Sequence, residues 1–219
     1  MLHVGLTGGI AAGKSVVCDR FEELGITVVE YDQLSRTVVE PGTPGLAAVV
    51  AAFGERVLAL DGTLDRSKLG HIVFADDEAR ERLEQIIHPL VIERGSALDA
   101  AAEARGEKLI IHSIPLLVEA IGAEVFDVVI VVDAPMEIRL ARLIHHRGMK
   151  RAEAWARIDA QTDDHVRMAA ADVVFDGSGT VEGLRAQVDA WVEDVRRNGV
   201  SYRPNPERGK FLITEDVVP

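Results

Sequence analysis

The sequence predicts a three-layer α/β protein, in which helices cover both faces of a parallel β-sheet. Short apolar runs typical of strands alternate with longer segments of helical spacing. The strand-like runs are continuous and rich in β-branched residues, as expected of strands buried on both faces. A glycine-rich turn stands between the first run and the first helical segment. Together these features favour right-handed βαβ crossovers.

The strands and the terminal helices of this core can be placed in order. The first helix carries Val16, Val17, Phe21 and Leu24 on one face, and Gly25 can end it. The last helix is expected over about 181–195, where apolar residues recur at helical spacing. The predicted strands cover residues 3–7, 27–31, 109–112, 128–132 and 172–175.

Two stretches interrupt the alternation of strands and helices. Between the second and third strands the chain shows no clear strand over a span far longer than an αβ loop needs. Helical patterns and turn signals at Pro41-Gly42, Pro44-Gly45 and Asp61-Gly62 predict a mostly helical lobe there, in which Pro89 should kink or interrupt its helix. The second stretch, about 136–168, is rich in arginine and should hold two helices.

Composition excludes several classes of protein. The chain has 219 residues, 47% of them hydrophobic, and a net charge of −12, which argues against a general nucleic-acid binder. The single cysteine, Cys18, rules out an intramolecular disulfide and suits a reducing compartment. The most apolar strand is too short to cross a bilayer, and the first residues lead directly into a strand. We therefore expect a cytoplasmic protein without a leader, a membrane partner or a nucleic-acid partner.

Residues Gly8–Ser15 match the pattern G-x-x-x-x-G-K-[ST] completely, in the strand-turn-helix context that this phosphate-binding motif requires. Backbone N–H groups and the helix N-terminus should form a concave anion site. Lys14 should reach the β- and γ-phosphates of a nucleoside triphosphate, and the Ser15 hydroxyl should bind Mg²⁺. The predicted nucleotide-binding residues are Gly9, Ile10, Ala11, Ala12, Gly13, Lys14, Ser15 and Val16.

Asp32 is the predicted general base. It follows the second strand, and ligands of open parallel sheets bind beyond the carboxyl ends of the strands. A carboxylate there could deprotonate an acceptor hydroxyl for in-line attack. The alternative is that Asp32 caps the next helix and forms a surface pair with Arg36.

Arginines in the stretch 136–168 are candidates for stabilising the charge that develops on a transferred phosphoryl group. Arg139 and Arg142 lie one helical turn apart and share a face, and Arg147 follows them. The alternative is a solvated helix face, and we expect one or two of the five arginines Arg139, Arg142, Arg147, Arg151 and Arg157 to be functional.

The combination of these segments resembles the dephospho-CoA kinase family over about residues 2–195. Val4–Ser15 is similar to the opening of those kinases, and Glu30-Tyr31-Asp32 with Arg36 looks like their Asp-x-Asp…Arg element. Further similar blocks include Pro41-Gly42, Phe53-Gly54, Asp61-Gly62-x-Leu64-Asp65-Arg66, His88-Pro89, Pro115-Leu116-Leu117-x-Glu119, Arg142-Leu143, Arg157-Ile158-x-x-Gln161 and Ala171-Asp172-Val173.

Three positions depart from the family pattern. Glu30 stands where the family usually has Asp, Ser113 stands where it often has an acidic residue, and Gly177 stands where Asn is common.

The resemblance implies an ATP- and Mg²⁺-dependent transfer of phosphate to the ribose 3′-hydroxyl of dephospho-CoA, the last step of coenzyme A synthesis. It implies catalytic roles for Asp32, Lys14 and Arg142, with Arg142 a lid contact, and substrate binding by Asp32, Arg36 and His88. We expect a P-loop core over 1–35, 106–135 and 169–200, a substrate lobe over 36–105, a lid over 136–168 and an irregular tail over 201–219. A monomer is compatible with these expectations.

Two rival functions remain open from the residues. Another small-molecule or nucleotide kinase could share the same core. A nucleotide-dependent switch would need no acceptor, although the guanine-specificity motif N-K-x-D is absent from the sequence.

Overall fold

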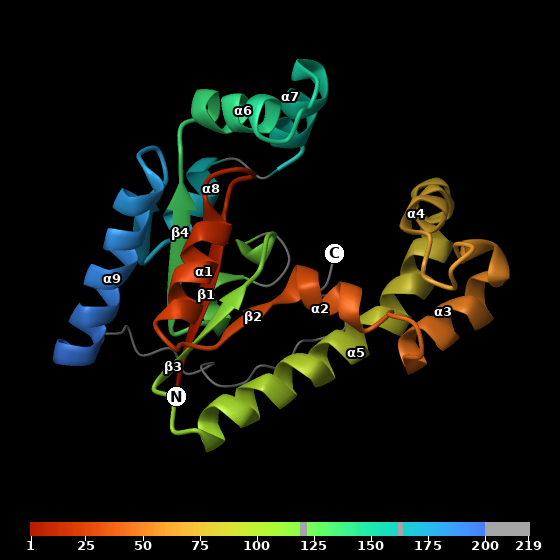
Figure 1. Cartoon of the computed structure of the whole chain (residues 1–219), viewed down its shortest axis with the longest axis horizontal. Helices are drawn as coiled ribbons and strands as arrows, with labels where there is room; N and C mark the ends of the chain where they lie inside the picture. Colours follow the sequence, from red (N-terminus) through yellow and green to blue (C-terminus); the bar gives the residue numbers. More distant parts are fainter. Residues whose placement is uncertain (119–121, 162–163, 200–219) are drawn as a thin grey trace. The chain divides into compact units, whose positions relative to one another are not determined.

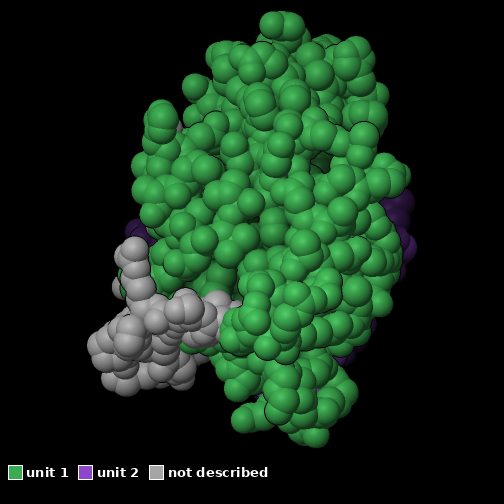
Figure 2. Space-filling model, turned by 90° about the vertical axis from the view of Figure 1, so that its left-hand side faces the viewer, with its two compact units in different colours: residues 1–28, 102–212 green, residues 29–101, 213–219 purple. Residues whose placement is uncertain are grey.

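The computed structural model describes residues 1–118, 122–161 and 164–199. The predicted tail, 201–219, lies outside the described residues. The described residues divide into two compact units, coloured separately in Figure 2. The first unit holds residues 1–28 and the described residues from 102 onward, and the second holds residues 29–101. The boundary between the units falls within the second strand.

The core is a five-stranded sheet in the order β2-β3-β1-β4-β5 (Figure 1). β1 pairs in parallel with β3 on one side and β4 on the other, and β4 pairs in parallel with β5. This confirms the predicted α/β fold with a parallel sheet. The strands are β1 (Leu2–Gly8), β2 (Val28–Glu30), β3 (Leu109–Ser113), β4 (Val128–Asp133) and β5 (Val173–Asp176).

One face of the sheet packs against α1 (Lys14–Glu23) and α9 (Val181–Asn198), which lie side by side (Figure 1). Alternate strand residues such as Leu6 and Ile130 are buried there with Phe21 and Val188. α1 ends as predicted at Gly25, whose φ of 75° suits glycine. The Ile26 N–H donates to the Phe21 carbonyl at 3.0 Å, the 6→1 bond of a Schellman motif.

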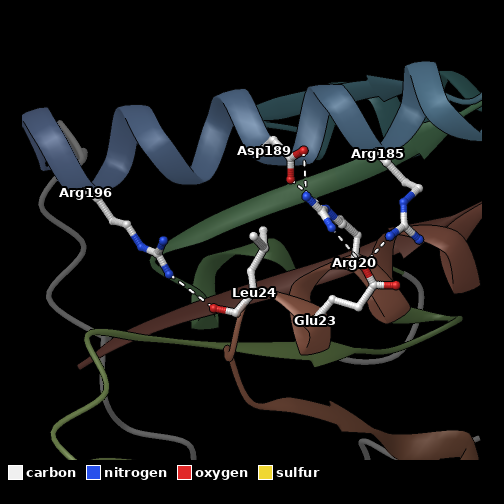
Figure 3. A network of polar contacts seen from close by, with 6 residues as sticks. All are labelled: Arg20, Glu23, Leu24, Arg185, Asp189 and Arg196. Atoms are coloured by element: carbon white, nitrogen blue, oxygen red, sulfur yellow. Dashed lines mark hydrogen bonds and ion pairs between the residues drawn. The ribbon is translucent and has the colours of Figure 1, made fainter.

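Ion pairs at the surface join α1 to α9 (Figure 3). The Arg20 guanidinium donates to both oxygens of Asp189, at 2.6 and 2.8 Å, and also pairs with Glu23. Arg185 reaches Glu23 from α9, and Arg196 donates to the Leu24 carbonyl at 3.3 Å. The hydrogen bonds from Arg20 lower the pKa values of the Glu23 and Asp189 carboxyls. Because these side chains are partly exposed to solvent, the ion pairs add little to the free energy of unfolding. Their effect is to orient α1 and α9.

Three helices connect β4 to β5 among the described residues, where the sequence predicts two. They are α6 (Met136–His145), α7 (Arg151–Asp159) and α8 (Asp164–Ala170). α6 and α7 share a small core of Leu140, Leu143, Ala154 and Ile158, against which Ile10 also packs. The sequence did not predict α8, because this helix is short and has no periodic pattern of apolar residues. Its buried side chain is Arg167.

The second unit is mostly helical. Its helices are α2 (Tyr31–Thr37), α3 (Pro44–Phe53), η1 (Glu55–Val57), α4 (Arg66–Ala75) and most of α5 (Asp77–Ala104). Its core gathers Val39, Val49, Phe53, Val57 and Leu69. The assignment of residues 36–105 to a substrate lobe stays a prediction.

One local expectation in this unit was wrong, and so was the expected interruption at Pro89. Pro44-Gly45 is not a turn, because Pro44 is the first residue of α3 and Thr43 caps the helix by accepting from the Leu46 N–H at 3.1 Å. Pro89 does not interrupt α5, which continues through it. Ile86 and Ile87 before Pro89 pack on the core and Val91 after it is fully buried, so packing on both sides offsets the lost backbone bond.

Among the described residues, none of the helices combines the length and the apolar character needed to cross a membrane.

Candidate active site

The phosphate-binding motif folds into a loop whose backbone is curled by unusual dihedral angles. Gly13 has a φ of 121°, and Ala11, with a φ of 61°, is the one non-glycine residue with positive φ in the described part of the chain. Such a conformation costs about 1 kcal/mol or more for alanine and recurs at functional sites. A turn of this kind can hold an anion against its backbone N–H groups. Within the turn, the Ala12 N–H donates to the Gly9 carbonyl at 3.0 Å. α1 begins at Lys14 and adds its positive N-terminal end.

Neighbouring elements hold the loop so closely that its glycines cannot gain a side chain. A Cβ at Gly13 would lie 2.8 Å from Leu184, and one at Gly8 would lie 2.5 Å from the Val132 carbonyl oxygen. The loop is therefore fixed by β4 below it and by α9 beside it.

Lys14 is held by a partner from the neighbouring strand. Its ammonium donates to the Ser113 hydroxyl at 2.8 Å, and the buried Cys18 thiol lies 3.4 Å from the same oxygen. Ser113 is itself buried at the end of β3. The sequence singled out Ser113 only as a departure from the family pattern. The structure gives it a role, because it fixes Lys14 against the loop without neutralising its charge.

Arg142 also belongs to the site, but its guanidinium is bonded to backbone. One nitrogen, Nη1, donates to the carbonyls of Ala11 and Ala12 at 3.1 Å each, and Nη2 donates to the Gly177 carbonyl at 2.6 Å. Arg142 therefore ties α6 to the phosphate loop and to the loop after β5. That Arg142 contacts donor phosphates stays a prediction, and it requires these carbonyls to be released.

A cavity of about 310 Å³ opens beside the second half of the phosphate loop. Its walls are mostly apolar or backbone. They come from the loop and α1, from α6, and from the segment that starts α9: Ala11, Gly13, Ser15, Val16, Arg142, His146, Arg147, Gly177, Gly179, Thr180, Val181 and Leu184. A cavity with this position and lining can hold the nucleoside of a triphosphate whose phosphates lie on the loop.

Gly177 lies at the floor of this region and has a packing reason to be glycine. A Cβ there would overlap the Ala12 carbonyl oxygen, to which Arg142 also donates. The replacement of the family's Asn by Gly thus lets the loop after β5 approach the phosphate loop.

Arg139 lies against the first half of the loop and is almost completely buried, at 2% exposure. Its Nε donates to the Ala134 carbonyl at 2.9 Å and its Nη2 to the Asp164 carboxylate, which Arg167 also contacts. Among the residues that the structure describes, Nη1 has no hydrogen-bond partner. Leaving such a buried donor unpaired costs about 1–3 kcal/mol.

The amide at the start of the loop is covered by a side chain. The Ile10 N–H donates to the Gln161 Oε1 at 2.7 Å. An amide oxygen therefore occupies a donor that the motif is expected to offer to phosphate. Gln161 appeared in the sequence only within a family block, because no local pattern connects residues so far apart.

Three predicted substrate residues lie in the second unit. Asp32 and Arg36 are exposed on α2, and His88 is buried at 8% exposure on α5. Asp32 is not a helix cap, since α2 begins at Tyr31 and Glu30 is the capping residue. Burial lowers the pKa of the His88 imidazole and favours its neutral form. The roles of all three stay predictions.

Sequence reasoning did not single out a further arginine beside Arg36. The Arg66 guanidinium donates to the Arg36 carbonyl at 3.4 Å. Partial burial and the nearby Arg36 charge lower the pKa of Arg66. The second unit thus holds the Arg66 guanidinium against the backbone of Arg36, and guanidinium groups suit a phosphorylated ligand.

Known proteins resemble the chain over most of its length. A kinase from Cutibacterium acnes named dephospho-CoA kinase is 50% identical over 190 residues, covering 86% of this chain and 82% of the relative. Another of that name, from Thermobifida fusca, is 48% identical over 198 residues, covering 90% of this chain and 98% of the relative.

Two solved structures share the fold. One, from Thermus thermophilus, has a TM-score of 0.74 and 28% identity and covers 89% of this chain and 97% of its own. The other, a dephospho-CoA kinase from Campylobacter jejuni, has a TM-score of 0.67 and 23% identity and covers 90% of this chain and 98% of its own.

The family profile for dephospho-CoA kinase matches residues 2–183, a span that includes the phosphate loop, Ser113, Arg139 and Arg142. By this match and by its similar relatives, the chain belongs to the dephospho-CoA kinase family.

Proposed function

We propose that this chain transfers the γ-phosphoryl group of ATP to the ribose 3′-hydroxyl of dephospho-CoA, giving coenzyme A and ADP. The observation that carries the proposal is the complete phosphate loop, with its positive φ values at Ala11 and Gly13 and its fixed lysine, in a member of this kinase family. The proposal places the reaction in the cytoplasm and leaves the oligomeric state open.

The first unit supplies the groups for the donor. Loop amides and the α1 N-terminus bind phosphate oxygens, while Lys14 is held by Ser113 where charge on the β- and γ-phosphates would meet it. The nucleoside lies in the cavity walled by Thr180 and Leu184. Because these groups are held by neighbouring strands and helices, they need little rearrangement as the transition state forms.

Among the described residues of the phosphate site, the start of α1 fits Mg²⁺. The exposed Ser15 hydroxyl would hold the ion, whereas the position of Ser113 offers a hydroxyl already used by Lys14 instead of a carboxylate. When bound, the ion would neutralise charge on the β- and γ-phosphate oxygens.

The second unit supplies the groups for the acceptor. Asp32, exposed in the first turn of α2, is the base that accepts the proton of the 3′-hydroxyl. Arg36 and its neighbour Arg66 bind phosphate groups of dephospho-CoA, which carries a diphosphate. His88, kept neutral by burial, can contribute a hydrogen bond but little charge.

The direct test is ADP release by the purified chain with ATP and Mg²⁺, with and without dephospho-CoA. We expect turnover that depends on dephospho-CoA and a product phosphorylated at the 3′ position. Nucleoside monophosphates and shikimate-like alcohols serve as competing acceptors. Turnover with one of these alone would favour another small-molecule kinase, and slow hydrolysis that no acceptor accelerates would favour a nucleotide switch.

A further inference from the structure

Arg139 is one of two buried arginines in the described part of the first unit, and the proposed function leaves its chemistry unexplained. Three parts of its side chain are accounted for: the aliphatic stem is buried, Nε is bonded to the Ala134 carbonyl, and Nη2 is bonded to Asp164. Those contacts fix the plane of the guanidinium. The remaining nitrogen, Nη1, has no acceptor in the described part of the chain, although it carries two N–H donors.

The unpartnered nitrogen is aimed at the phosphate loop. A Cβ added to Gly9 would overlap Arg139 Nη1 and contact the carbon of the guanidinium, so the cation lies directly on the second residue of the motif. Gly9 is itself buried. Gly9 therefore has to be glycine, because any side chain would displace the cation.

The surroundings of Arg139 indicate which part of a nucleotide it would meet. The apolar cavity contacts Gly13, Ser15 and Val16, at the helix end of the loop. A different cavity of about 340 Å³ is lined by Arg139, Gln161, Asp164 and Arg167, with Asp159, Trp155, Met136 and Ile158. It adjoins the other end of the loop, where Gln161 covers the Ile10 amide. A triphosphate with its nucleoside in the first cavity would run along the loop toward the second.

The charges in the second cavity are compatible with a bound phosphate group. Arg139 and Arg167 are 2% and 3% exposed, and both contact Asp164, whose side chain is 44% exposed. The other carboxylate in the lining, Asp159, is exposed. The buried part of the cavity thus holds two guanidinium groups and one carboxylate that already serves both.

We infer that Arg139 is a catalytic residue, whose Nη1 donates to the terminal phosphate of the bound triphosphate and stabilises that group during transfer. Arg142 is a positioning residue, because both of its terminal nitrogens hold backbone carbonyls of the loop and of Gly177. The inference rests on the proposed phosphoryl transfer but not on the identity of the acceptor.

The test compares equilibrium binding of ATP and ADP by calorimetry, without any acceptor. A contact to the terminal phosphate is absent from the ADP complex, so Arg139→Gln should weaken ATP binding by about 10- to 100-fold and leave ADP binding nearly unchanged. Arg139→Lys, which keeps the charge and is less disruptive to folding, should restore only part of the preference for ATP.

Exposed Arg151→Gln, on α7, is the control. Because Arg151 lies outside the lining of both cavities, this variant should change neither the affinity for ATP nor the affinity for ADP.

Kinetics separate the inference from the proposed function. The two Arg139 variants should lower kcat with any accepted substrate, by about 100-fold or more for the glutamine variant. Well-folded Arg139 variants that lose ATP and ADP affinity equally, or neither, would overturn the inference even if the wild type phosphorylates dephospho-CoA. Conversely, a wild type inactive on dephospho-CoA whose ATP preference depends on Arg139 would overturn the acceptor assignment alone.

Discussion

At the scale of single residues, the site is built from side chains whose surroundings restrict what they can do. The Lys14 ammonium donates to a hydroxyl and not to a carboxylate, and in the part of the chain that the structure describes Arg139 Nη1 has no hydrogen-bond partner. Asp32, by contrast, is exposed and is not used as a helix cap, so its carboxylate is available to a substrate.

Asp32→Asn tests that availability. The amide keeps the size of the side chain but cannot accept the hydroxyl proton, so we expect kcat to fall by about 10²- to 10⁴-fold with ATP affinity unchanged. Steady-state kinetics and ATP titration measure the two quantities. Glu40→Gln, which neutralises another exposed carboxylate just beyond α2, should be silent. A variant that loses stability but keeps kcat would show Asp32 to be structural.

His112 makes the stability of the fold depend on pH. It is fully buried on β3, where its ring stacks on His3 and contacts Phe126. Burial, and then the nearby His3, lower the pKa of His112 from 6.5 to about 3. Between these values the unfolded chain binds a proton that the native state excludes. Stability is therefore lost as the pH falls below about 6.5, by up to about 1.4 kcal/mol per pH unit.

Urea unfolding between pH 7.5 and 5.5 measures this loss, above the range in which the carboxyls titrate in the unfolded chain. His112→Asn, which cannot be charged, should flatten the dependence even though it lowers stability at pH 7.5. The exposed His71→Gln should leave the slope as in the wild type. An unchanged slope in the His112 variant would assign the pH dependence to other groups.

At the scale of elements, the sequence predicted what repeats locally and missed what depends on distant contacts. β-branched runs identified the strands and the motif identified the loop, because both are patterns of neighbouring residues. The partnerships of Lys14 with Ser113 and of Ile10 with Gln161 join residues 99 and 151 positions apart, and only packing brings them together. Pro89 failed as a helix breaker for the same reason, since burial of its neighbours outweighed local propensity.

Gly177→Ala tests the close packing of the loop after β5 on the phosphate loop. The added Cβ would overlap the Ala12 carbonyl oxygen, so the two loops must separate and the Arg142 bridge must lengthen. We expect ATP and ADP affinities to fall together, by about 10-fold, as for the loss of one or two hydrogen bonds. Gly70→Ala, where a Cβ meets nothing closer than 3.9 Å, controls for glycine replacement as such. Unchanged nucleotide affinity would mean that the loops adapt freely.

At the scale of the whole molecule, the predicted roles divide between the two compact units. Nucleotide-binding candidates, with Arg139 and Arg142, belong to the first unit, whereas Asp32, Arg36 and His88 belong to the second. This division predicts that the two substrates slow hydrogen exchange of backbone amides in different parts of the chain. Hydrogen exchange measured by mass spectrometry can follow both parts in one experiment.

We expect a non-hydrolysable ATP analogue to slow exchange mainly in the phosphate loop and in α6–α8, because its phosphates occupy loop amides and Arg139. Dephospho-CoA alone should slow exchange mainly within residues 29–101, around α2 and α5. Lys14→Ala should abolish the first pattern and leave the second, since its ammonium serves phosphate charge and not the core. If dephospho-CoA protected only the first unit, residues 36–105 would be a structural insertion, and the base that activates its 3′-hydroxyl would have to be sought elsewhere than at Asp32.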